Sequence, residues 1–349
     1  MINASGIGTY LQNIVPLIIS HFPDVNFHLL GKKQELKKID LTKKNVALTN
    51  CQSPIYSISE QIELPRKIPK DTHIYWATHY NIPFVNYPKL LVTIYDLFHL
   101  AMPELVGGLH KRLYAKYMFA RVFKRANAIF TISNFTKNEF IRLLGNRQGI
   151  YPIPLGVEES WFGIQNMEQI YPRPYLLFVG NVKPHKNLTG LIDAFELVAN
   201  KIPHDLVIVG KKDGFITGDK LITSKANKLG ARITFTGHVE DEILKRYFTQ
   251  ADAFIFPSLY EGFGLPPLEA MAAGCPVLVS SRASLPEVCG NAAIYFDPLD
   301  PVDIADKILK LLNDSLLKET LIIAGKKRAR EFTWEKCATK TSEIISRIL

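Results

Sequence analysis

The chain has 349 residues, more than a single hydrophobic core usually supports, so its length favours two domains. Hydrophobic residues make up 47% and charged residues 21%, a balance that excludes an intrinsically disordered chain. The sequence has neither a run of roughly 18–20 apolar residues nor a basic-then-apolar leader, so we expect a cytoplasmic protein.

Charge is distributed unevenly along the chain. The net charge is +9, with 19 Lys/Arg against 9 Asp/Glu in residues 1–155 and 23 against 24 in residues 156–349. Such an excess suits nucleic acid, an anionic membrane or a phosphorylated substrate, or it marks only a solvated basic surface. The cysteines lack the paired spacing of disulfides or zinc sites, so we expect reduced, buried thiols at Cys51, Cys275, Cys289 and Cys337.

The first half of the chain alternates helix and strand signals. It opens with Gly6 and Gly8 in a loop-and-helix pattern that no strand precedes, although a doubly wound domain normally has a central strand there. We therefore expect the first strand of this domain to be missing. Apolar runs and helical spacing predict strands at 26–30, 73–76, 90–95 and 128–132, and helices at 7–20, 109–125 and 134–144.

The second half has a clearer rhythm. Strands are predicted at 175–180, 206–210, 232–236, 253–257 and 276–280, and helices at 187–201, 217–229, 240–250 and 266–273. Strands that alternate with helices form a parallel sheet covered on both faces. The sequence thus predicts an α/β fold of two facing, doubly wound Rossmann-like domains, at 1–157 and 175–349. A linker rich in Pro and Gly is predicted at 158–174, and a last helix at about 333–349 would pack back on the first domain.

The stretch 256–274, FPSLYEGFGLPPLEAMAAG, carries the strongest site signal. Glu261 and Glu269 stand eight residues apart, with Gly262 and Gly264 between them and a proline-opened helix following. Glycines let backbone N–H groups approach a ligand, and a helix start supplies donors suited to a phosphate. Two carboxylates beside such a turn fit the hydroxyls of a sugar and a ribose. The plain alternative is a helix start with ordinary acidic surface residues.

A second cluster follows the strand predicted at 175–180, in the run VGNVKPHKN. Lys183, His185 and Lys186 gather there before the next helix. Cations at the carboxyl end of a strand, where open parallel sheets bind ligands, would neutralise a diphosphate leaving group. Taken alone, the cluster is equally typical of a solvated loop.

The order of these segments resembles the retaining glycosyltransferases of family 4, glycosyl transferases group 1, with their two-domain GT-B architecture. The similarity runs through nearly the whole chain. It includes GIGTYLQNIV, LLVTIYDLFHLAMPE, TISNFTKNEF, PIPLGVEESWF, FVGNVKPHKNL, the Glu–x7–Glu stretch and ASLPEVCGNAAIYFDP.

The resemblance implies a donor site mostly in the second domain. Lys186 would contact the donor diphosphate, Glu261 the hydroxyls of the transferred sugar, and Glu269 the ribose. Asn181 stands where many relatives have arginine, which weakens the case for a two-cation clamp. The other implied donor-binding residues are Gly6, Gly8, Gly180, Gly237, Val239, Gly262, Phe263, Gly264 and Leu265.

The first domain would supply the remaining groups. Tyr95 and Asp96 stand where many relatives have His-Asp, and tyrosine can donate a hydrogen bond there but cannot carry a proton near neutral pH. The resemblance implies four catalytic candidates: Glu261, Lys186, Tyr95 and Asp96. The segment WATHYNIPF resembles a position facing the acceptor, which implies acceptor contacts from His79, Tyr80 and Asn81, although a histidine near a strand end is as often structural.

The resemblance extends to substrates. The run EGFGLPPLEAMAAG and the later SLPEV resemble mannosyl- and rhamnosyl-type transferases of surface-polysaccharide assembly, so GDP-mannose is the first expected donor. Glucosyl and N-acetylhexosaminyl donors stay open. The expected acceptor is a glycan or a polyprenyl-linked sugar, and nucleic acid is not an expected partner. The chain has no Asp-x-Asp pair, so we expect neither a metal nor another cofactor.

The helix at 109–125 is basic and amphipathic, which suits contact with the inner face of an anionic membrane or, equally, an ordinary helix with one core face. Two other functions stay open. A sugar-nucleotide epimerase of the same architecture would need acid/base side chains at the sugar. A truncated, non-catalytic homologue would explain the expected loss of a first strand together with Tyr95 and Asn181.

Overall fold

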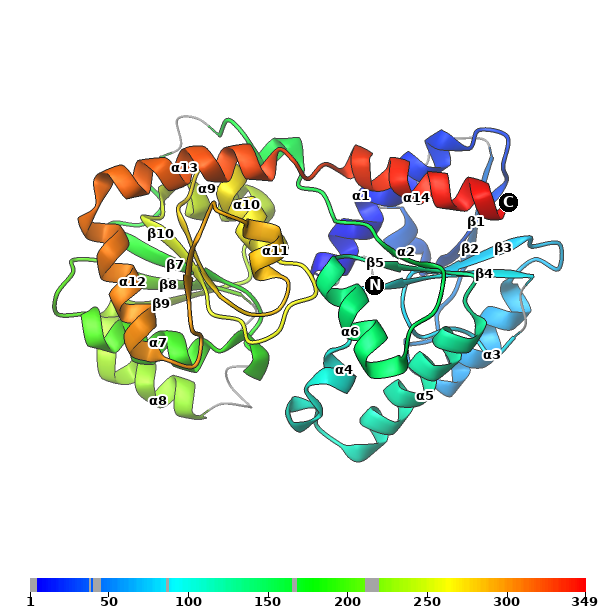
Figure 1. Cartoon of the computed structure of the whole chain (residues 1–349), viewed down its shortest axis with the longest axis horizontal. Helices are drawn as coiled ribbons and strands as arrows, with labels where there is room; N and C mark the ends of the chain where they lie inside the picture. The colour runs from blue at the N-terminus through cyan, green and yellow to red at the C-terminus, as the bar shows by residue number, and fades with distance from the viewer. Residues whose placement is uncertain (1–4, 38, 40–44, 86–87, 165–167, 211–219) are drawn as a thin grey trace. The chain divides into compact units, whose positions relative to one another are not determined.

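A computed structural model describes residues 5–37, 39, 45–85, 88–164, 168–210 and 220–349 (Figure 1). The chain divides into two compact units. Unit 1 comprises residues 1–156 and 333–349, and unit 2 comprises residues 157–332. The chain therefore passes between the units twice.

Unit 2 contains one six-stranded parallel sheet in the order β12-β11-β10-β7-β8-β9. This is the doubly wound order, in which the chain leaves the first strand in one direction and later returns to its other side. The reversal falls between β7 and β10. The strands are β7 (Tyr175–Val179), β8 (Asp205–Val209), β9 (Ile233–Gly237), β10 (Ala253–Phe256), β11 (Val277–Ser280) and β12 (Ile294–Phe296).

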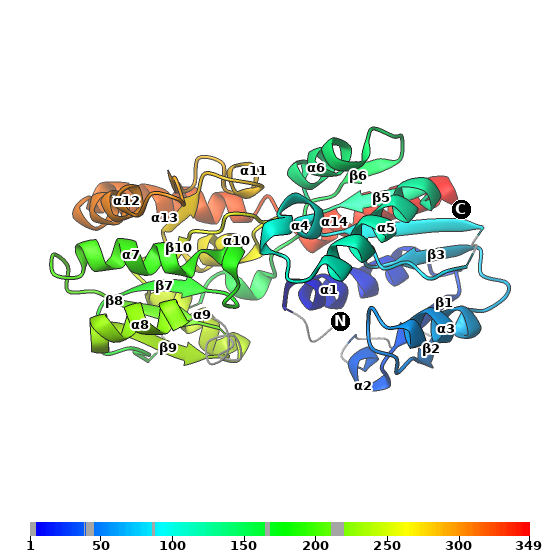
Figure 2. The same ribbon diagram turned by 90° about the horizontal axis from the view of Figure 1, so that it is seen from below.

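Helices cover both faces of this sheet (Figures 1 and 2). They are α7 (Leu188–Val198), α8 (Lys220–Leu229), α9 (Asp241–Gln250), α10 (Leu265–Ala273), α11 (Leu285–Cys289), α12 (Pro301–Asn313) and α13 (Ser315–Ala329). Short 3-10 turns lie at Glu159–Trp161, Pro184–Lys186 and Gly230–Arg232. The strand predictions for this half agree with the structure to within two residues at each end. The predicted helix at 217–229 begins outside the described residues and continues as α8.

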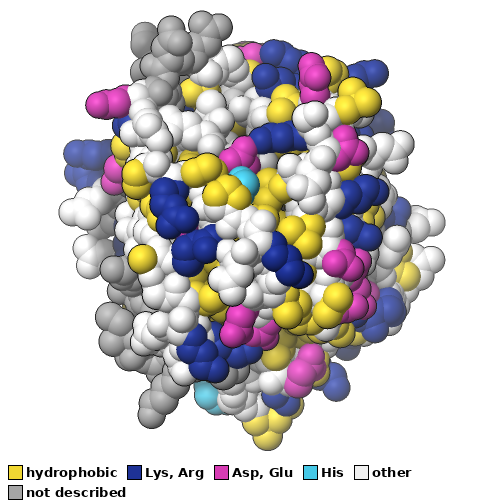
Figure 3. All heavy atoms as spheres, turned by 90° about the vertical axis from the view of Figure 1, so that its left-hand side faces the viewer, with side chains coloured by type: hydrophobic (Ala, Val, Ile, Leu, Met, Phe, Trp, Pro, Cys, Tyr) yellow, Lys and Arg dark blue, Asp and Glu magenta, His cyan; other side chains and the backbone are white. Residues whose placement is uncertain are grey.

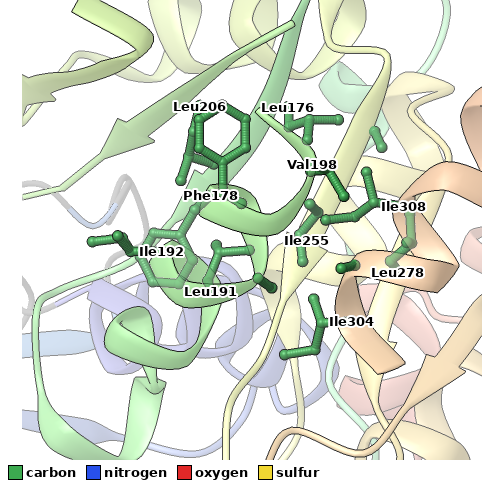
Figure 4. Close-up of a cluster of buried hydrophobic side chains, with 14 of the residues drawn as sticks. Leu176, Phe178, Leu191, Ile192, Val198, Leu206, Ile255, Leu278, Ile304 and Ile308 are labelled. Carbon is green, nitrogen blue, oxygen red and sulfur yellow. The ribbon is translucent and has the colours of Figure 1, made fainter. Parts of the chain in front are cut away.

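The main core of unit 2 forms where α7, α8 and α12 pack on one face of the sheet (Figure 4). Alternate strand residues point to this face, such as Leu176 and Phe178 on β7. On α7, Leu188, Leu191 and Phe195 recur at helical spacing to meet them. This packing fixes the sheet whose carboxyl edge carries the predicted site.

Unit 1 has two separate parallel sheets instead of the single sheet that the sequence suggested. One pairs β1 (Phe27–Gly31) with β2 (Val46–Asn50). The other has the order β3-β4-β5-β6, formed by β3 (Ile74–Ala77), β4 (Lys89–Ile94), β5 (Ala128–Thr131) and β6 (Ile150–Pro152). Among the described residues no strand lies between β1 and β3 to pair with both, so the two sheets are not joined by hydrogen bonds.

The helices of unit 1 are α1 (Ser5–His21), α2 (Lys33–Leu36), α3 (Ile58–Lys67), α4 (Phe98–Ala101), α5 (Leu109–Arg125), α6 (Asn134–Leu144) and α14 (Trp334–Ile348), with a 3-10 turn at Pro103–Leu105. The last helix, α14, packs along α1. His21 Nδ1 lies 2.8 Å from Ser342 Oγ, and the rings of Tyr10 and Trp334 are 6.1 Å apart. The final helix thus belongs to the first unit.

The described residues of the segment predicted as a linker, 158–164 and 168–174, belong to unit 2. Trp161 is buried, with its ring 5.6 Å from that of Phe248, and Ile170 N–H donates to Gln250 Oε1 at 2.9 Å. The passages between the units lie instead at 156/157 and 332/333. Sequence composition placed the boundary in the Pro-rich stretch because it could not show that Trp161 anchors that stretch to a helix.

Two further predictions concern the whole chain. All four cysteines are buried free thiols, as expected. Among the helices in the described ranges, none combines the length and the apolar character needed to cross a membrane. The face of unit 2 drawn in Figure 3 carries side chains of both Lys/Arg and Asp/Glu, scattered among hydrophobic and other groups.

Candidate functional site

The predicted donor residues gather at the carboxyl ends of β7 and β10, where the strand order reverses. Ligands of open α/β sheets bind at such a point, because the loops leaving its two strands diverge. Here the loop after β10 is tied to the loop after β7 by a hydrogen bond from Leu259 N–H to His185 O at 2.7 Å. The two loops therefore form one structure.

Lys186 and Glu261 meet across these two loops. Lys186 Nζ lies 2.5 Å from Glu261 Oε1, and the side chains are only 17% and 14% exposed. Lys186 Nζ also lies 5.0 Å from the centre of the Phe256 ring, an additional favourable site for a cation. A carboxylate can accept about four hydrogen bonds, so the pair with Lys186 leaves Glu261 capacity for the hydroxyls of a sugar.

The structure narrows the predicted cation cluster to one residue. Burial, followed by the neighbouring charge of Lys186, lowers the pKa of His185 to about 4, so His185 is neutral near pH 7. Lys183 is exposed to solvent. Lys186 is thus the cation held by the site, and the prediction of three gathered cations is wrong in that respect. The sequence could not show this because the neutrality of His185 arises from its folded surroundings.

Ser284 anchors the loop from Gly262 to Leu265 through hydrogen bonds to its backbone and to that of Glu261. The Ser284 hydroxyl is fully buried and donates towards Glu261 O at 2.9 Å and Phe263 O at 2.6 Å. Gly264 caps α10 with a φ of +116°, and a Cβ there would lie 2.9 Å from Leu285 Cδ2, so only glycine fits well. Ser284 was not predicted, because its partners lie more than twenty residues away in sequence.

The start of α10 offers fewer donors than a helix usually does. Two of its first residues, Pro266 and Pro267, have no N–H group. The available backbone donors are those of the loop and of Leu265. Anion binding here therefore depends on the loop backbone more than on the helix itself.

Glycines mark the ends of three adjacent strands at the same edge of the sheet: Gly180 and Gly210 directly follow β7 and β8, and Gly237 is the last residue of β9. Gly180 N–H donates to Val209 O, and Gly210 N–H donates to Gly237 O, each at 2.9 Å. A Cβ on Gly210 would lie 2.1 Å from Gly180 O, so a side chain cannot be accommodated there. Asn181 and Val239 are partly exposed beside this edge. The predicted positions Gly180, Asn181, Gly237 and Val239 thus share one edge with Lys186 and Glu261.

Glu269 lies on α10 and is mostly withdrawn from solvent. Burial raises the pKa of its carboxyl to about 8, with smaller contributions from the negative charges of Glu158 and Asp241. A carboxyl with this pKa is largely protonated at pH 7 and can then donate as well as accept a hydrogen bond. The structure is compatible with the predicted ribose contact but adds a pH dependence that the sequence did not reveal.

The predicted residues of unit 1 fall in several places. Gly6 and Gly8 lie in the first turn of α1, and the residues before it are outside the described ranges. Asp96 Oδ1 accepts the Phe98 N–H at 2.9 Å, a local turn contact. Their roles towards a substrate stay predictions.

Tyr95 is packed rather than presented to solvent. Its ring stands edge-on to that of Tyr10, 5.5 Å away, and its buried hydroxyl has no hydrogen-bond partner among the described residues. Burial, with added contributions from Tyr10 and Cys337, holds the pKa of this hydroxyl well above its usual range. Tyr95 therefore stays neutral, in line with the expectation that it does not carry a proton, and its catalytic role stays a prediction.

The predicted acceptor residues are held in a polar and aromatic cluster. Asn81 Nδ2 donates to Glu60 Oε2 at 2.7 Å, and Tyr114 OH donates to Asn81 Oδ1. The rings of His79 and Tyr80 are tilted against each other with centres 4.3 Å apart, and Tyr80 stacks on Phe119. These contacts bring three segments of unit 1 together.

Tyr56 completes this cluster and was not predicted. Its hydroxyl lies 3.2 Å from His79 Nε2, its N–H donates to Glu60 Oε2 at 2.7 Å, and the residue is 45% exposed. Its φ of +67° is unusual for a residue with a side chain and is often found at functional sites. Burial lowers the pKa of His79 to about 4, with a smaller effect of His99, so His79 is neutral near pH 7.

The comparisons with known proteins agree with the arrangement of unit 2. The family model described as "Glycosyl transferases group 1" matches residues 165–328. O-antigen chain mannosyltransferase B of Escherichia coli is 30% identical over 289 residues, covering 77% of this chain and 73% of that protein. The chain belongs to the glycosyl transferases group 1. Serotype-specific mannosyltransferase WbdA of Escherichia coli is 31% identical, but the match covers only 35% of that longer protein.

Solved structures confirm the fold of this glycosyltransferase. Sucrose-phosphate synthase from Thermosynechococcus elongatus superposes with a TM-score of 0.76 and 20% identity, covering 99% of this chain and 94% of that one. Anabaena Alr3699/HepE, in complex with UDP and glucose, gives 0.74 and 15%, covering 98% and 96%. At these identities the likeness concerns the fold alone, which is the predicted α/β fold with two Rossmann-like domains, GT-B.

Proposed function

We propose that this glycosyltransferase moves a hexose, in the first instance mannose, from a nucleotide sugar to a glycan or polyprenyl-linked acceptor in surface-polysaccharide synthesis. The observation that carries the proposal is the Lys186–Glu261 pair at the carboxyl edge of the sheet in unit 2. The lysine charge suits the diphosphate of a sugar nucleotide, and the glutamate carboxylate can accept hydrogen bonds from the hydroxyls of its sugar. The similarity to mannosyltransferases named for O-antigen chains supports mannose as the sugar. We propose GDP-mannose as the donor.

The donor is proposed to bind with its diphosphate beside Lys186 and the loop Gly262–Leu265. Breaking the bond between the sugar and the phosphate leaves negative charge on the departing diphosphate and positive charge on the sugar. Lys186 and the loop N–H groups would stabilise the first, and the Glu261 carboxylate would hold the sugar through its hydroxyls. Glu269 would accept or donate hydrogen bonds at the ribose.

We further propose transfer with retention of configuration and without a bound metal. In that reaction the acceptor hydroxyl attacks the face of the sugar that the diphosphate leaves, and its proton passes to the leaving phosphate oxygen. Two features of the described residues support this route. Burial lowers the pKa of His79 in unit 1 and of His185 in unit 2 to about 4, which makes both imidazoles weak bases, and the Tyr95 hydroxyl stays protonated. The acceptor is proposed to contact the cluster of Tyr56, His79 and Asn81 in unit 1.

A donor panel tests the proposal. UDP-, GDP- and dTDP-sugars are supplied to the purified chain, and release of the nucleoside diphosphate is measured with and without glycan acceptors. We expect one donor to be preferred, with GDP-mannose first, and Glu261→Ala to lower turnover at least tenfold. The matched control is Glu242→Ala, which also removes the partner of a buried lysine, Lys245, but lies on exposed surface. Its rate should stay within twofold of the original.

Several results would contradict the proposal. Equal rates for the parent and Glu261→Ala would remove Glu261 from the site. A product with inverted anomeric configuration, read by NMR, would exclude retention. Conversion of a donor sugar to its epimer without any acceptor would favour a sugar-nucleotide epimerase. If no donor binds or is cleaved, the chain is a non-catalytic member of the family.

A further inference from the structure

The outer face of α5 carries an uncovered apolar row. The helix turns Ala115, Met118, Phe119 and Val122 into the core of unit 1. Opposite that core face, Leu109, Leu113 and Tyr117 follow one another at intervals of four, and they are 69%, 57% and 53% exposed. The exposed ring of Phe84 stacks against Tyr117 with centres 6.0 Å apart. We call Leu109, Leu113, Tyr117 and Phe84 the apolar ridge.

The apolar ridge is surrounded by positive charge. Helix α5 has no acidic residue, and its cations are Lys111, Arg112, Lys116, Arg121, Lys124 and Arg125. Helical spacing places Lys116 and Lys124 on the same side as the ridge, and both are exposed. The Arg121 guanidinium lies 4.1 Å above the Phe84 ring. Apolar and cationic groups therefore alternate on one surface.

Helix α3 repeats this pattern on a smaller scale. Ile58, Ile62 and Arg66 follow at intervals of four, and all three are exposed. Its acidic residues face other groups: Glu60 accepts from Asn81, and Glu63 pairs with Lys67. Tyr56, two residues before α3, brings this end of the helix to α5, because its ring lies 6.2 Å from that of Tyr114.

We propose that the apolar ridge is a docking surface for an anionic phospholipid bilayer. Apolar side chains in this arrangement gain by entering the headgroup boundary, and lysines and arginines beside them gain from acidic headgroups. A second copy of the chain fits poorly, because pairing two ridges would oppose the cations of one α5 to those of the other, and α5 has no acidic residue to compensate them. The proposal goes beyond the proposed function, since it requires neither a donor nor an acceptor.

The surface also has a consequence for the substrate. Tyr114 comes from α5 itself and donates a hydrogen bond to Asn81 in the predicted acceptor cluster. A bilayer held against α5 would thus lie one helix away from that cluster. A sugar carried on a lipid anchor could reach the cluster without leaving the membrane.

Vesicle binding tests the docking surface. The full chain is sedimented with vesicles of phosphatidylcholine alone, or containing about 30% phosphatidylglycerol. We expect binding to the anionic vesicles that weakens with salt, and a loss of at least tenfold for the combined variant Leu109→Ser, Leu113→Ser, Tyr117→Ser. Lys116→Gln with Lys124→Gln should weaken binding to anionic vesicles in particular. The control Leu316→Ser with Ile323→Ser removes apolar groups more than half exposed on α13 of unit 2 and should bind as the parent does.

Other results would overturn the proposal. They are failure of the parent to bind anionic vesicles, unchanged binding by the triple variant, or an equal loss in the α13 control. A parent dimer in solution that the triple variant converts to a monomer would assign the ridge to self-association. Circular dichroism and donor turnover without vesicles establish that the variants are folded, and the turnover separates this outcome from failure of the proposed function. In a Tyr117→Trp variant, quenching by brominated lipid should report insertion directly.

Discussion

Glu269 is a side chain whose ionisation depends strongly on its place in the fold. The ordinary pKa of a glutamate carboxyl, 4.5, is raised to about 8 here, chiefly by burial. Between these two values the folded protein holds a proton that the unfolded chain has released. The free energy of unfolding therefore falls as the pH rises from about 4.5 to about 8, and it is independent of this group above that range.

We expect Glu269→Gln to remove this pH dependence, because the amide has the same shape and does not ionise. Urea unfolding of the parent and the variant at several pH values checks it: the parent should lose stability relative to the variant as pH rises from 5 to about 8. Donor affinity of the parent should also change over this window, while that of the variant stays flat. Parallel stability profiles for the two proteins would contradict the burial of Glu269.

At the level of single residues, the sequence predicted candidate side chains but not their ionisation states. Glu261 and Lys186 were assigned from local motifs, and the structure brings them to 2.5 Å although 75 residues separate them. The neutrality of His185 and the protonation of Glu269 could not be predicted, since both result chiefly from burial in the folded protein. No sequence motif marked Tyr56, because its contact with His79 forms only in the folded chain.

At the level of elements, the loop before α10 depends on one hydroxyl. Ser284 holds the carbonyls of Glu261 and Phe263, and both would lose this partner in Ser284→Ala. A buried acceptor left unsatisfied costs about 1–3 kcal/mol, and the loop N–H groups would lose their fixed orientation. We expect lower stability together with a several-fold higher KM for the donor.

Ser258→Ala is the matched control for this loop. Ser258 is as deeply buried as Ser284, but its hydroxyl has no hydrogen-bond partner in the described part of the chain. Its removal should leave the KM for the donor unchanged and should not lower the melting temperature. Equal effects of the two substitutions would show that Ser284 acts only as core filling.

The more deeply an element is buried in the structure, the more clearly its residues predict it from the sequence. β7 and β10 lie in the interior of a sheet covered on both faces, so they appear as continuous apolar runs that predict strands directly. α3, by contrast, has no buried residue along its described length and contains Pro65, so no apolar periodicity marks it. β2 has only half-buried and exposed residues and was missed for the same reason.

At the level of the whole molecule, the two stretches of chain that connect the units pass close together at Gly156, and this close approach requires a glycine. A Cβ at this position would lie 2.3 Å from Trp334 N and 2.5 Å from Thr333 C. Because both of these are backbone atoms, no side-chain movement can relieve the clash. Gly156→Ala should therefore displace α14 from α1 and destabilise unit 1.

Hydrogen exchange of the Gly156→Ala variant checks this expectation. Protection should fall in α1 and α14 and stay unchanged in β7, β8 and β10 of unit 2. Gly107→Ala serves as the control, because a Cβ there meets no atom within 4 Å and the residue has no positive φ. Uniform loss of protection across both units would contradict the assignment of α14 to unit 1.

The double passage also determines the order in which the chain can fold as it is synthesised. Unit 2 is one continuous stretch, residues 157–332, and can fold as soon as it is made. Unit 1 begins first but lacks the cover that α14 gives to α1 until residues 333–349 are added. Tyr10 and Ile14 of α1 are both buried in the complete protein, and we expect them to become fully buried only once α14 is in place. The half of the protein that is translated first is thus the half that is completed last.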